Sequence, residues 1–83
     1  MNEETLKEVK LQLHAAYPVP LTAARIHRDA KKAGYTFTLR DVTAALTFLK
    51  DDGVAQAKDE TGTIEQRFTL TAKGVRHCIE LFS

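Results

Sequence analysis

Apolar residues recur at helical spacing near the start of the chain. Leu6, Val9, Leu13 and Ala16 follow one another at intervals of three and four residues, which places them on one face of a helix. Pro18 comes shortly afterwards, and the residue before a proline is biased away from the helical conformation. The pattern predicts a first helix from about residue 3 to residue 16.

The segment 22–33 predicts a second helix. Thr22 can cap its start, because a threonine side chain accepts a hydrogen bond from a backbone N–H of the first turn. Gly34 can adopt the left-handed conformation that closes a helix. The inner face of this helix is expected to carry small apolar residues, namely Ala23, Ile26, Ala30 and Ala33.

The segment 38–52 predicts a third helix with a signal at each end. Thr38 and Asp41 have the spacing of an approximate capping box, and Gly53 can end the helix before a strand. The residues expected to point inward are Leu39, Val42, Ala45, Leu46 and Leu49.

The pattern then changes to that of a two-stranded ribbon. Residues 54–57 form a short, weak strand, and residues 58–63 have the composition of a turn. Residues 64–70 alternate as a returning strand with one solvent-facing side. The covered side is expected to carry Ile64, Gln66, Phe68 and Leu70, and the solvent-facing side Glu65, Arg67 and Thr69.

A final helix completes the predicted fold. Thr71 can cap it, and its inner stripe is expected to be Val75, Cys78, Ile79 and Phe82. An early third strand is expected to be reduced to residues 19–21 or to be absent. The fold class is therefore α+β and mostly α, with the order α-α-α-β-β-α and a two-stranded wing.

Length and composition narrow the classes of protein to which the chain can belong. Its 83 residues are expected to form a single domain, 1–83, with a modest core. The chain has no apolar run long enough for a membrane span, a polar and acidic start unlike a secretory signal, and one cysteine. A lone cysteine fits a reducing compartment, so we expect a cytoplasmic protein without membrane contact.

Charge is unevenly distributed although the net charge is only +1. Residues 21–50 hold six lysines or arginines against two aspartates, whereas residues 51–66 hold five acidic residues against one lysine. Such asymmetry bears on the choice of partners rather than on the fold. It predicts a basic middle and an acidic hairpin.

Signs of catalysis or of a metal site are missing from the sequence. His14, His27, His77 and Cys78 do not have the spacing of metal ligands, and no glycine-rich phosphate loop is present. We therefore expect no enzyme activity, no metal and no cofactor.

Two stretches resemble parts of the winged helix-turn-helix domains of small bacterial regulators of the MarR and PadR sort. Residues 42–54, VTAALTFLKDDGV, are similar to a recognition helix that exits into the wing, and residues 68–74, FTLTAKG, are similar to the segment that leaves the wing and opens the last helix. The resemblance implies a small prokaryotic or phage transcription regulator that binds double-stranded DNA.

The resemblance also implies roles for individual residues. In the family the third helix enters the major groove and the wing contacts adjacent phosphates. Carried over, the residues of helix 38–52 that contact DNA are Arg40, Thr43, Ala44 and Thr47. Those at the base of the wing are Lys58 and Arg67. The charge and spacing of the basic helix 22–33, rather than the resemblance, add Arg25, Arg28, Lys31 and Lys32 as candidate phosphate contacts.

Each of these roles has a plainer alternative. The row Arg25, Arg28 and Lys32 can follow a phosphate backbone, or it can be a solvated face with Asp29 as a local partner. Thr47 can meet a base edge or a thymine methyl, or it can be a plain surface position. The acidic wing tip and the apolar Phe48 leave open a second function, a winged-helix protein-interaction module without DNA binding.

Dimerisation is expected from the terminal helices, because in the resembled families these helices form the dimer. The candidate interface residues lie away from the predicted core stripes, and they are Leu11, Ala15 and Leu81. Isolated exposed leucines are also normal on a monomer, so this patch has a neutral alternative as well.

Overall fold

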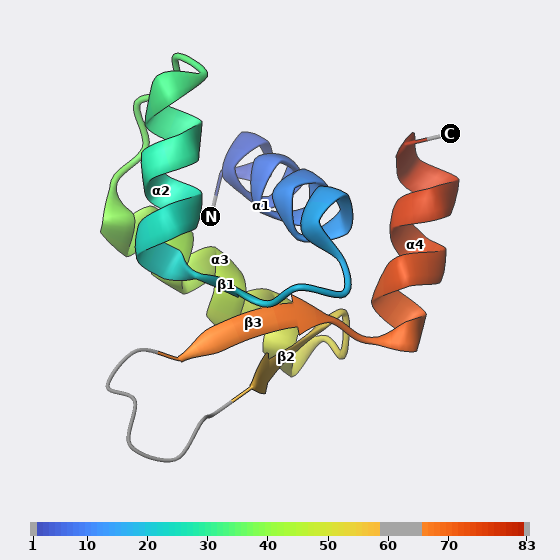
Figure 1. The fold of residues 1–83 in the computed structure, drawn as a ribbon. Helices are drawn as coiled ribbons and strands as arrows, with labels where there is room; N and C mark the ends of the chain where they lie inside the picture. Colours follow the sequence, from blue (N-terminus) through green and yellow to red (C-terminus); the bar gives the residue numbers. More distant parts are fainter. Residues whose placement is uncertain (1, 59–65, 83) are drawn as a thin grey trace.

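Four helices and three short strands make up the computed structural model, which describes residues 2–58 and 66–82 (Figure 1). In chain order the elements are α1 (Glu3–Ala16), β1 (Leu21–Thr22), α2 (Ala23–Lys32), α3 (Leu39–Asp51), β2 (Ala55–Lys58), β3 (Arg67–Leu70) and α4 (Ala72–Phe82). The predicted α+β, mostly helical fold is confirmed, and the four predicted helices agree with the observed ones to within one or two residues at each end.

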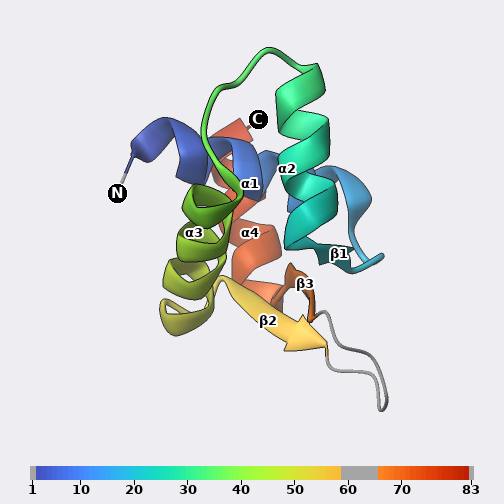
Figure 2. The ribbon, with the colours of Figure 1, turned by 90° about the vertical axis from the view of Figure 1, so that its left-hand side faces the viewer.

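The core lies where α1, α2 and α3 meet above the sheet (Figures 1 and 2). Val9 and Leu13 from α1, Ile26 from α2, and Val42 and Leu46 from α3 are fully or almost fully buried. Burying side chains of this size stabilises a fold by about 1.5–3 kcal/mol each. The predicted inner stripes of the first three helices therefore supply most of the packing that fixes their relative positions.

The sheet is three-stranded and antiparallel, with β3 between β1 and β2. Leu21 in β1 pairs with Phe68 in β3, and Ala55 in β2 pairs with Leu70. The predicted two-stranded wing is β2 and β3, and the early third strand, expected at residues 19–21 or absent, is present as the two-residue β1 immediately before α2. Two residues carry too little pattern to be distinguished from a loop by sequence.

The helix ends follow the predicted capping signals. The Thr22 hydroxyl accepts a hydrogen bond from the Arg25 N–H at 3.2 Å, and Thr38 and Asp41 form a reciprocal capping box at 3.2 and 2.8 Å. Gly53 follows α3 with a φ of 78°, a left-handed conformation that favours glycine. These signals fix where α3 starts and stops, and hence which of its residues face outward.

Four residues predicted to point inward or to the covered side of the ribbon are exposed: Ala33, Leu39, Gln66 and Ile79. Gln66 lies just before the first residue of β3. Leu39 and Ile79 lie at the edge of their helical stripes, since a helix turns by about 100° per residue. Ala33 caps the end of α2, beyond its last buried turn. Conversely, Thr69 is buried although it was predicted to face solvent: the last three residues of β3 are buried in succession, so both faces of the strand are covered there.

Candidate nucleic-acid interface

A solvent-open hollow of about 500 Å³ lies between the start of α2, the outer side of α3 and β3. We call it the sheet-side hollow. Its lining residues are Ala23, Ala24, Leu39, Thr43, Leu46, Thr47, Gln66 and Phe68. It combines exposed threonine and glutamine side chains with a floor of core residues, so a macromolecule can approach α3 here without displacing any packed element.

A second hollow, of about 600 Å³, adjoins the first where the chain passes from α2 to α3. We call it the turn-side hollow. It is lined by His27, Lys31 and residues 34–39. Because Leu39 lines both hollows, they form one continuous surface, named here the α2–α3 face.

The predicted DNA-contacting residues of α3 lie on the outside of this helix. Arg40, Thr43, Ala44 and Thr47 are all exposed. Both threonine hydroxyls donate hydrogen bonds within the helix, Thr43 to the carbonyl of Leu39 at 2.9 Å and Thr47 to the carbonyl of Thr43 at 3.1 Å. Of these four residues, Arg40 therefore presents a guanidinium group and Ala44 a methyl group, whereas the two threonine hydroxyls are bonded within the helix.

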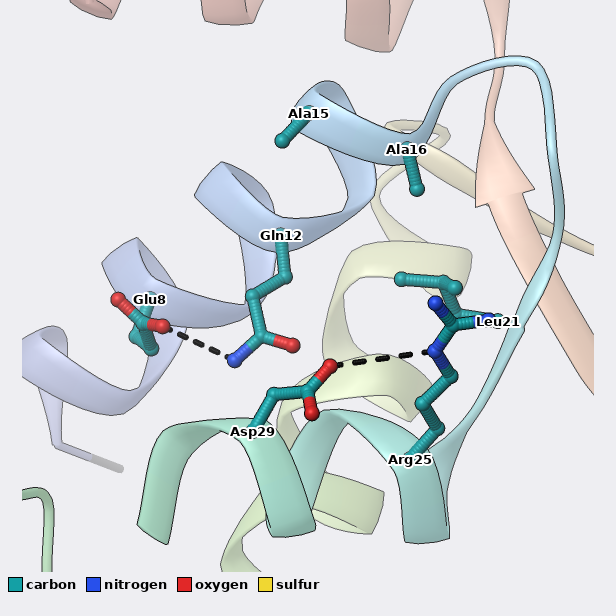
Figure 3. Close-up of a pocket in the computed structure, with 7 residues that line it drawn as sticks. All are labelled: Glu8, Gln12, Ala15, Ala16, Leu21, Arg25 and Asp29. Atoms are coloured by element: carbon teal, nitrogen blue, oxygen red, sulfur yellow. Dashed lines mark hydrogen bonds and ion pairs between the residues drawn. The ribbon is translucent and has the colours of Figure 1, made fainter. Parts of the chain in front are cut away.

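The basic residues of α2 are divided between two sides of the helix. Lys31 lines the turn-side hollow, whereas Arg25 lines a hollow on the other flank of α2, against α1 (Figure 3). The Nε atoms of Arg25 and Arg28 lie 3.9 and 3.8 Å from the carboxylate of Asp29. Asp29 is therefore a local partner of this basic row, as the solvated-face interpretation expected. Arg25 does not line the α2–α3 face.

A buried carboxylate connects α1 to α2 behind this face. Glu8 is only 8% exposed, and its Oε2 atom accepts a hydrogen bond from the Gln12 side-chain amide at 2.9 Å (Figure 3). The same amide donates to the carbonyl of Ile26 at 3.2 Å, which joins the two helices. The negative charge of Glu8 is also the main cause of a raised pKa at the Tyr35 hydroxyl, followed by burial of that hydroxyl. Glu8 therefore interacts with the segment just before α3 as well as with α2.

The base of the wing brings two cations together. Lys58 in β2 pairs in register with Arg67 in β3, and Arg67 also pairs with Thr22 in β1. Lys58 is exposed and Arg67 is half-buried. The predicted acidic tip, with Asp59, Glu60 and Glu65, lies outside the described residues.

Sequence reasoning did not select most of the residues that line the α2–α3 face; Ala24, His27, Leu39 and Gln66 are examples. A usable signal was present for two of them. Positions 24, 27 and 31 follow helical spacing, and this row lies beside the buried stripe of Ile26 and Ala30. Gln66 had no such signal, since its position depends on the pairing of β3 with two other strands.

The predicted dimer residues are exposed on α1 and α4. Leu11 and Leu81 are 43% and 46% exposed, and Ala15 is exposed at the edge of the α1–α2 hollow. The two helices lie against each other, and the Lys10 ammonium is 3.1 Å from the His77 imidazole. Ile79, more than half exposed, adds another apolar side chain on α4.

Within residues 2–58 and 66–82, no three His, Cys, Asp or Glu side chains are grouped so that they could hold a metal ion. No helix in the same ranges has the length and apolar character needed to cross a bilayer. Cys78 is a buried core residue, and burial raises the pKa of its thiol.

The fold is similar to that of several solved proteins. A protein from Ralstonia eutropha that is proposed to bind DNA superposes with a TM-score of 0.75 at 24% identity, over all of both chains. A PadR-like transcription factor from Bacteroides fragilis superposes with a TM-score of 0.75 at 22% identity, over 95% of this chain and 80% of that one.

PadR of Bacillus subtilis, solved in complex with operator DNA, superposes with a TM-score of 0.67 at 17% identity, over 90% of this chain and 46% of its own. No protein-family model matches the sequence, and no curated protein matches it significantly. With identities below 25%, these likenesses concern the fold, and they confirm the predicted winged helix of PadR-like type.

Proposed function

We propose that this chain is a winged-helix regulator that binds duplex DNA through its α2–α3 face. The observation that carries the proposal is the exposed outer side of α3, which is capped at Thr38 and ended at Gly53 and has open hollows beside it. An α-helix fits the major groove of B-DNA, and a helix that is buried on one side and free on the other can enter it. The fold neighbours include one protein named as a PadR-like transcription factor and one solved with operator DNA.

In this proposal each group of residues has a physical task. Arg40, Thr43, Ala44 and Thr47 enter the groove, where Arg40 can donate to guanine or to a phosphate. Lys31 and Lys32 are exposed cations at the end of α2 and contact phosphates, together with Arg28 and with Lys58 and Arg67 of the wing base. Arg25 contributes least, because it lies on the α1 flank beside Asp29.

We also propose that the protein acts as a homodimer joined through α1 and α4. Leu11, Ala15 and Leu81 are exposed on these two neighbouring helices. Two copies related by a twofold axis would present two α3 helices to successive major grooves, as dimeric helix-turn-helix proteins do. Sedimentation of the wild type and of Leu81→Lys tests this point: a dimer that the substitution dissociates is expected, and a wild-type monomer at high concentration contradicts it.

We place the protein in the cytoplasm as a transcription regulator rather than an enzyme. The similarity of its fold to DNA-binding proteins supports this assignment.

Fluorescence anisotropy of labelled duplex DNA over a salt series tests the DNA-binding proposal. Binding that weakens as salt rises is expected, because each neutralised phosphate releases condensed counterions. Lys31→Ala is expected to reduce the slope of log K against log salt by about 1. Arg76→Ala, an exposed cation on α4, is the matched control and should leave that slope unchanged. Absence of duplex binding at low salt would refute the proposal.

The protein-interaction alternative rests on one specific observation. Phe48 is a large apolar side chain on α3 and is 49% exposed. Phe48→Ala tests the alternative: loss of a co-purifying partner, in a protein whose wild type binds no duplex DNA at low salt, favours it.

A further inference from the structure

The two threonines on the outer side of α3 use their hydroxyl groups within the helix. Thr43 donates to the carbonyl of Leu39 at 2.9 Å, and Thr47 donates to the carbonyl of Thr43 at 3.1 Å. Each bond spans four residues, the back-bonding pattern that threonine adopts inside helices. The proton of each hydroxyl is therefore engaged and is not directed at anything outside the protein.

The branched Cβ of threonine determines what remains on the surface. One branch is the hydroxyl and the other is a methyl group, so a hydroxyl held against the preceding turn leaves the methyl as the outward group. Both residues are exposed, and both line the sheet-side hollow. Their spacing of four residues puts their β carbons about 5–6 Å apart on one face of the helix.

The surroundings of these methyl groups are aliphatic. None of the described residues that line the sheet-side hollow carries a charge. Ala24 adds an exposed methyl group, and the Leu39 side chain extends the same surface. Gln66 supplies the amide group of this lining. A surface of this kind favours apolar partners over phosphates.

We propose that α3 recognises thymine through methyl-to-methyl contact, with Thr43 and Thr47 each placed against the C5 methyl of a thymine in the major groove. This inference rests on the proposed DNA binding and adds the sequence class of the target. Thymine is the base that presents a methyl group in that groove, and threonine and alanine methyls are its usual apolar contacts. Successive base pairs are about 3.4 Å apart, so the two contacted thymines lie one or two steps apart.

The first experiment removes the methyl from the DNA. Duplexes bound by the protein are selected from a random library, and each thymine of the selected site is then replaced by deoxyuridine, which pairs identically but lacks the methyl. The expected loss is about fourfold in affinity at each contacted thymine, the value of one buried methyl group. Deoxyuridine outside the footprint is the control and should change nothing.

The second experiment removes the methyl from the protein. Thr47→Ser keeps the hydroxyl and its hydrogen bond to Thr43 but lacks the methyl, and it should abolish the deoxyuridine penalty at one thymine. Thr47→Val keeps an outward methyl and should preserve the penalty. Recognition through the hydroxyl would give the opposite order, with Ser retaining affinity and Val losing it. Circular dichroism of both variants confirms that α3 is intact.

The outcomes separate this inference from the proposed function. If no duplex binds, DNA binding itself is refuted. If duplexes bind but thymine and uracil are equivalent at every position, or the selected sites lack thymine, the methyl recognition is refuted while DNA binding stands. An independent check replaces a contacted thymine first by cytosine and then by 5-methylcytosine. The second base restores the methyl group, so partial recovery of the affinity lost with cytosine is expected.

Discussion

Gly74 in the first turn of α4 lies so close to the backbone carbonyl of Val54 that no β carbon fits between them. The same carbonyl accepts a hydrogen bond from the Thr71 N–H at 3.0 Å, and the Thr71 hydroxyl donates to the Gly53 carbonyl at 2.6 Å. These contacts hold the segment that follows α3 against the start of α4. The second motif of the sequence, FTLTAKG, owes its last glycine to this contact.

Gly74→Ala should destabilise the protein, although alanine normally favours a helix over glycine by about 0.5–1 kcal/mol. The added methyl overlaps a backbone atom, which costs about 1–3 kcal/mol when a packed site has to shift. Urea denaturation followed by circular dichroism measures the change in the free energy of unfolding. Ala72→Ser, at an exposed position in the same turn, should change it by less than about 0.5 kcal/mol. A stabilised Gly74→Ala variant would show that Gly74 and the Val54 carbonyl do not pack as closely as described.

Thr38→Ala should lower the free energy of unfolding by about 1 kcal/mol, because α3 loses the side chain that accepts the Asp41 N–H. Thr36→Ala is the matched control, since Thr36 is exposed two residues earlier and lies outside the helix. Thermal unfolding of the two variants beside the wild type makes the comparison. Equal losses from both substitutions would mean that the capping box contributes nothing specific.

Glu8→Gln should lower the pKa of Tyr35 towards its ordinary value. The Glu8 carboxylate is the largest cause of the raised value, since a nearby negative charge opposes ionisation of the phenol. Titration of tyrosinate absorbance in the ultraviolet measures the effect. Glu80→Gln on α4 should leave the titration curve unchanged, and an equal shift in that variant would exclude a specific role for Glu8.

Asp29→Asn should strengthen binding to duplex DNA at low salt by a few-fold. The substitution removes the carboxylate that lies 3.9 and 3.8 Å from the Arg25 and Arg28 side chains, and it raises the positive potential of α2. The gain should shrink as salt is added, since these side chains are exposed and their interactions are screened. Asp51→Asn at the far end of α3 provides a comparison, and a larger gain there would place the phosphates nearer that end.

Cys78 should resist alkylation at neutral pH in the folded protein and react once the chain is unfolded in urea. Its side chain is fully buried, and burial raises the pKa of the thiol, so little thiolate is present. The unfolded thiol ionises near pH 8.5, below the folded value, so the free energy of unfolding should fall as the pH rises beyond that point. Mass spectrometry of alkylated samples follows the reaction, and fast labelling of the native protein would contradict the packing of α4.

Local signals made most of the fold predictable. Thr22, Thr38, Gly34 and Gly53 act through bonds within four residues of themselves, so sequence spacing alone locates the helix ends they mark. Buried positions were also predictable where the middle of an apolar helical stripe faces the neighbouring elements, as at Val42 and Leu46. The prediction of burial was wrong for Leu39 and Ile79, which lie at the solvent-exposed edge of a stripe.

The candidate site was less predictable because it depends on how elements meet. The sequence places Arg25, Arg28 and Lys32 in one row, but only the packing of α2 against α1 shows that Arg25 lies on the flank away from α3. Gln66 joins Thr43 and Thr47 through the pairing of three strands, one of them only two residues long. Long-range contacts of this kind leave no periodic trace in the sequence.

Thr22 belongs to two elements at once, since it pairs with Arg67 in the central strand and caps α2 through the Arg25 N–H. Because one residue serves both elements, no loop separates the sheet from the start of α2. In the proposed complex, the sheet and α2 therefore keep their relative position when the protein meets the duplex. Adjustments of shape on binding then fall to the nucleic acid, which favours sites whose base steps bend easily.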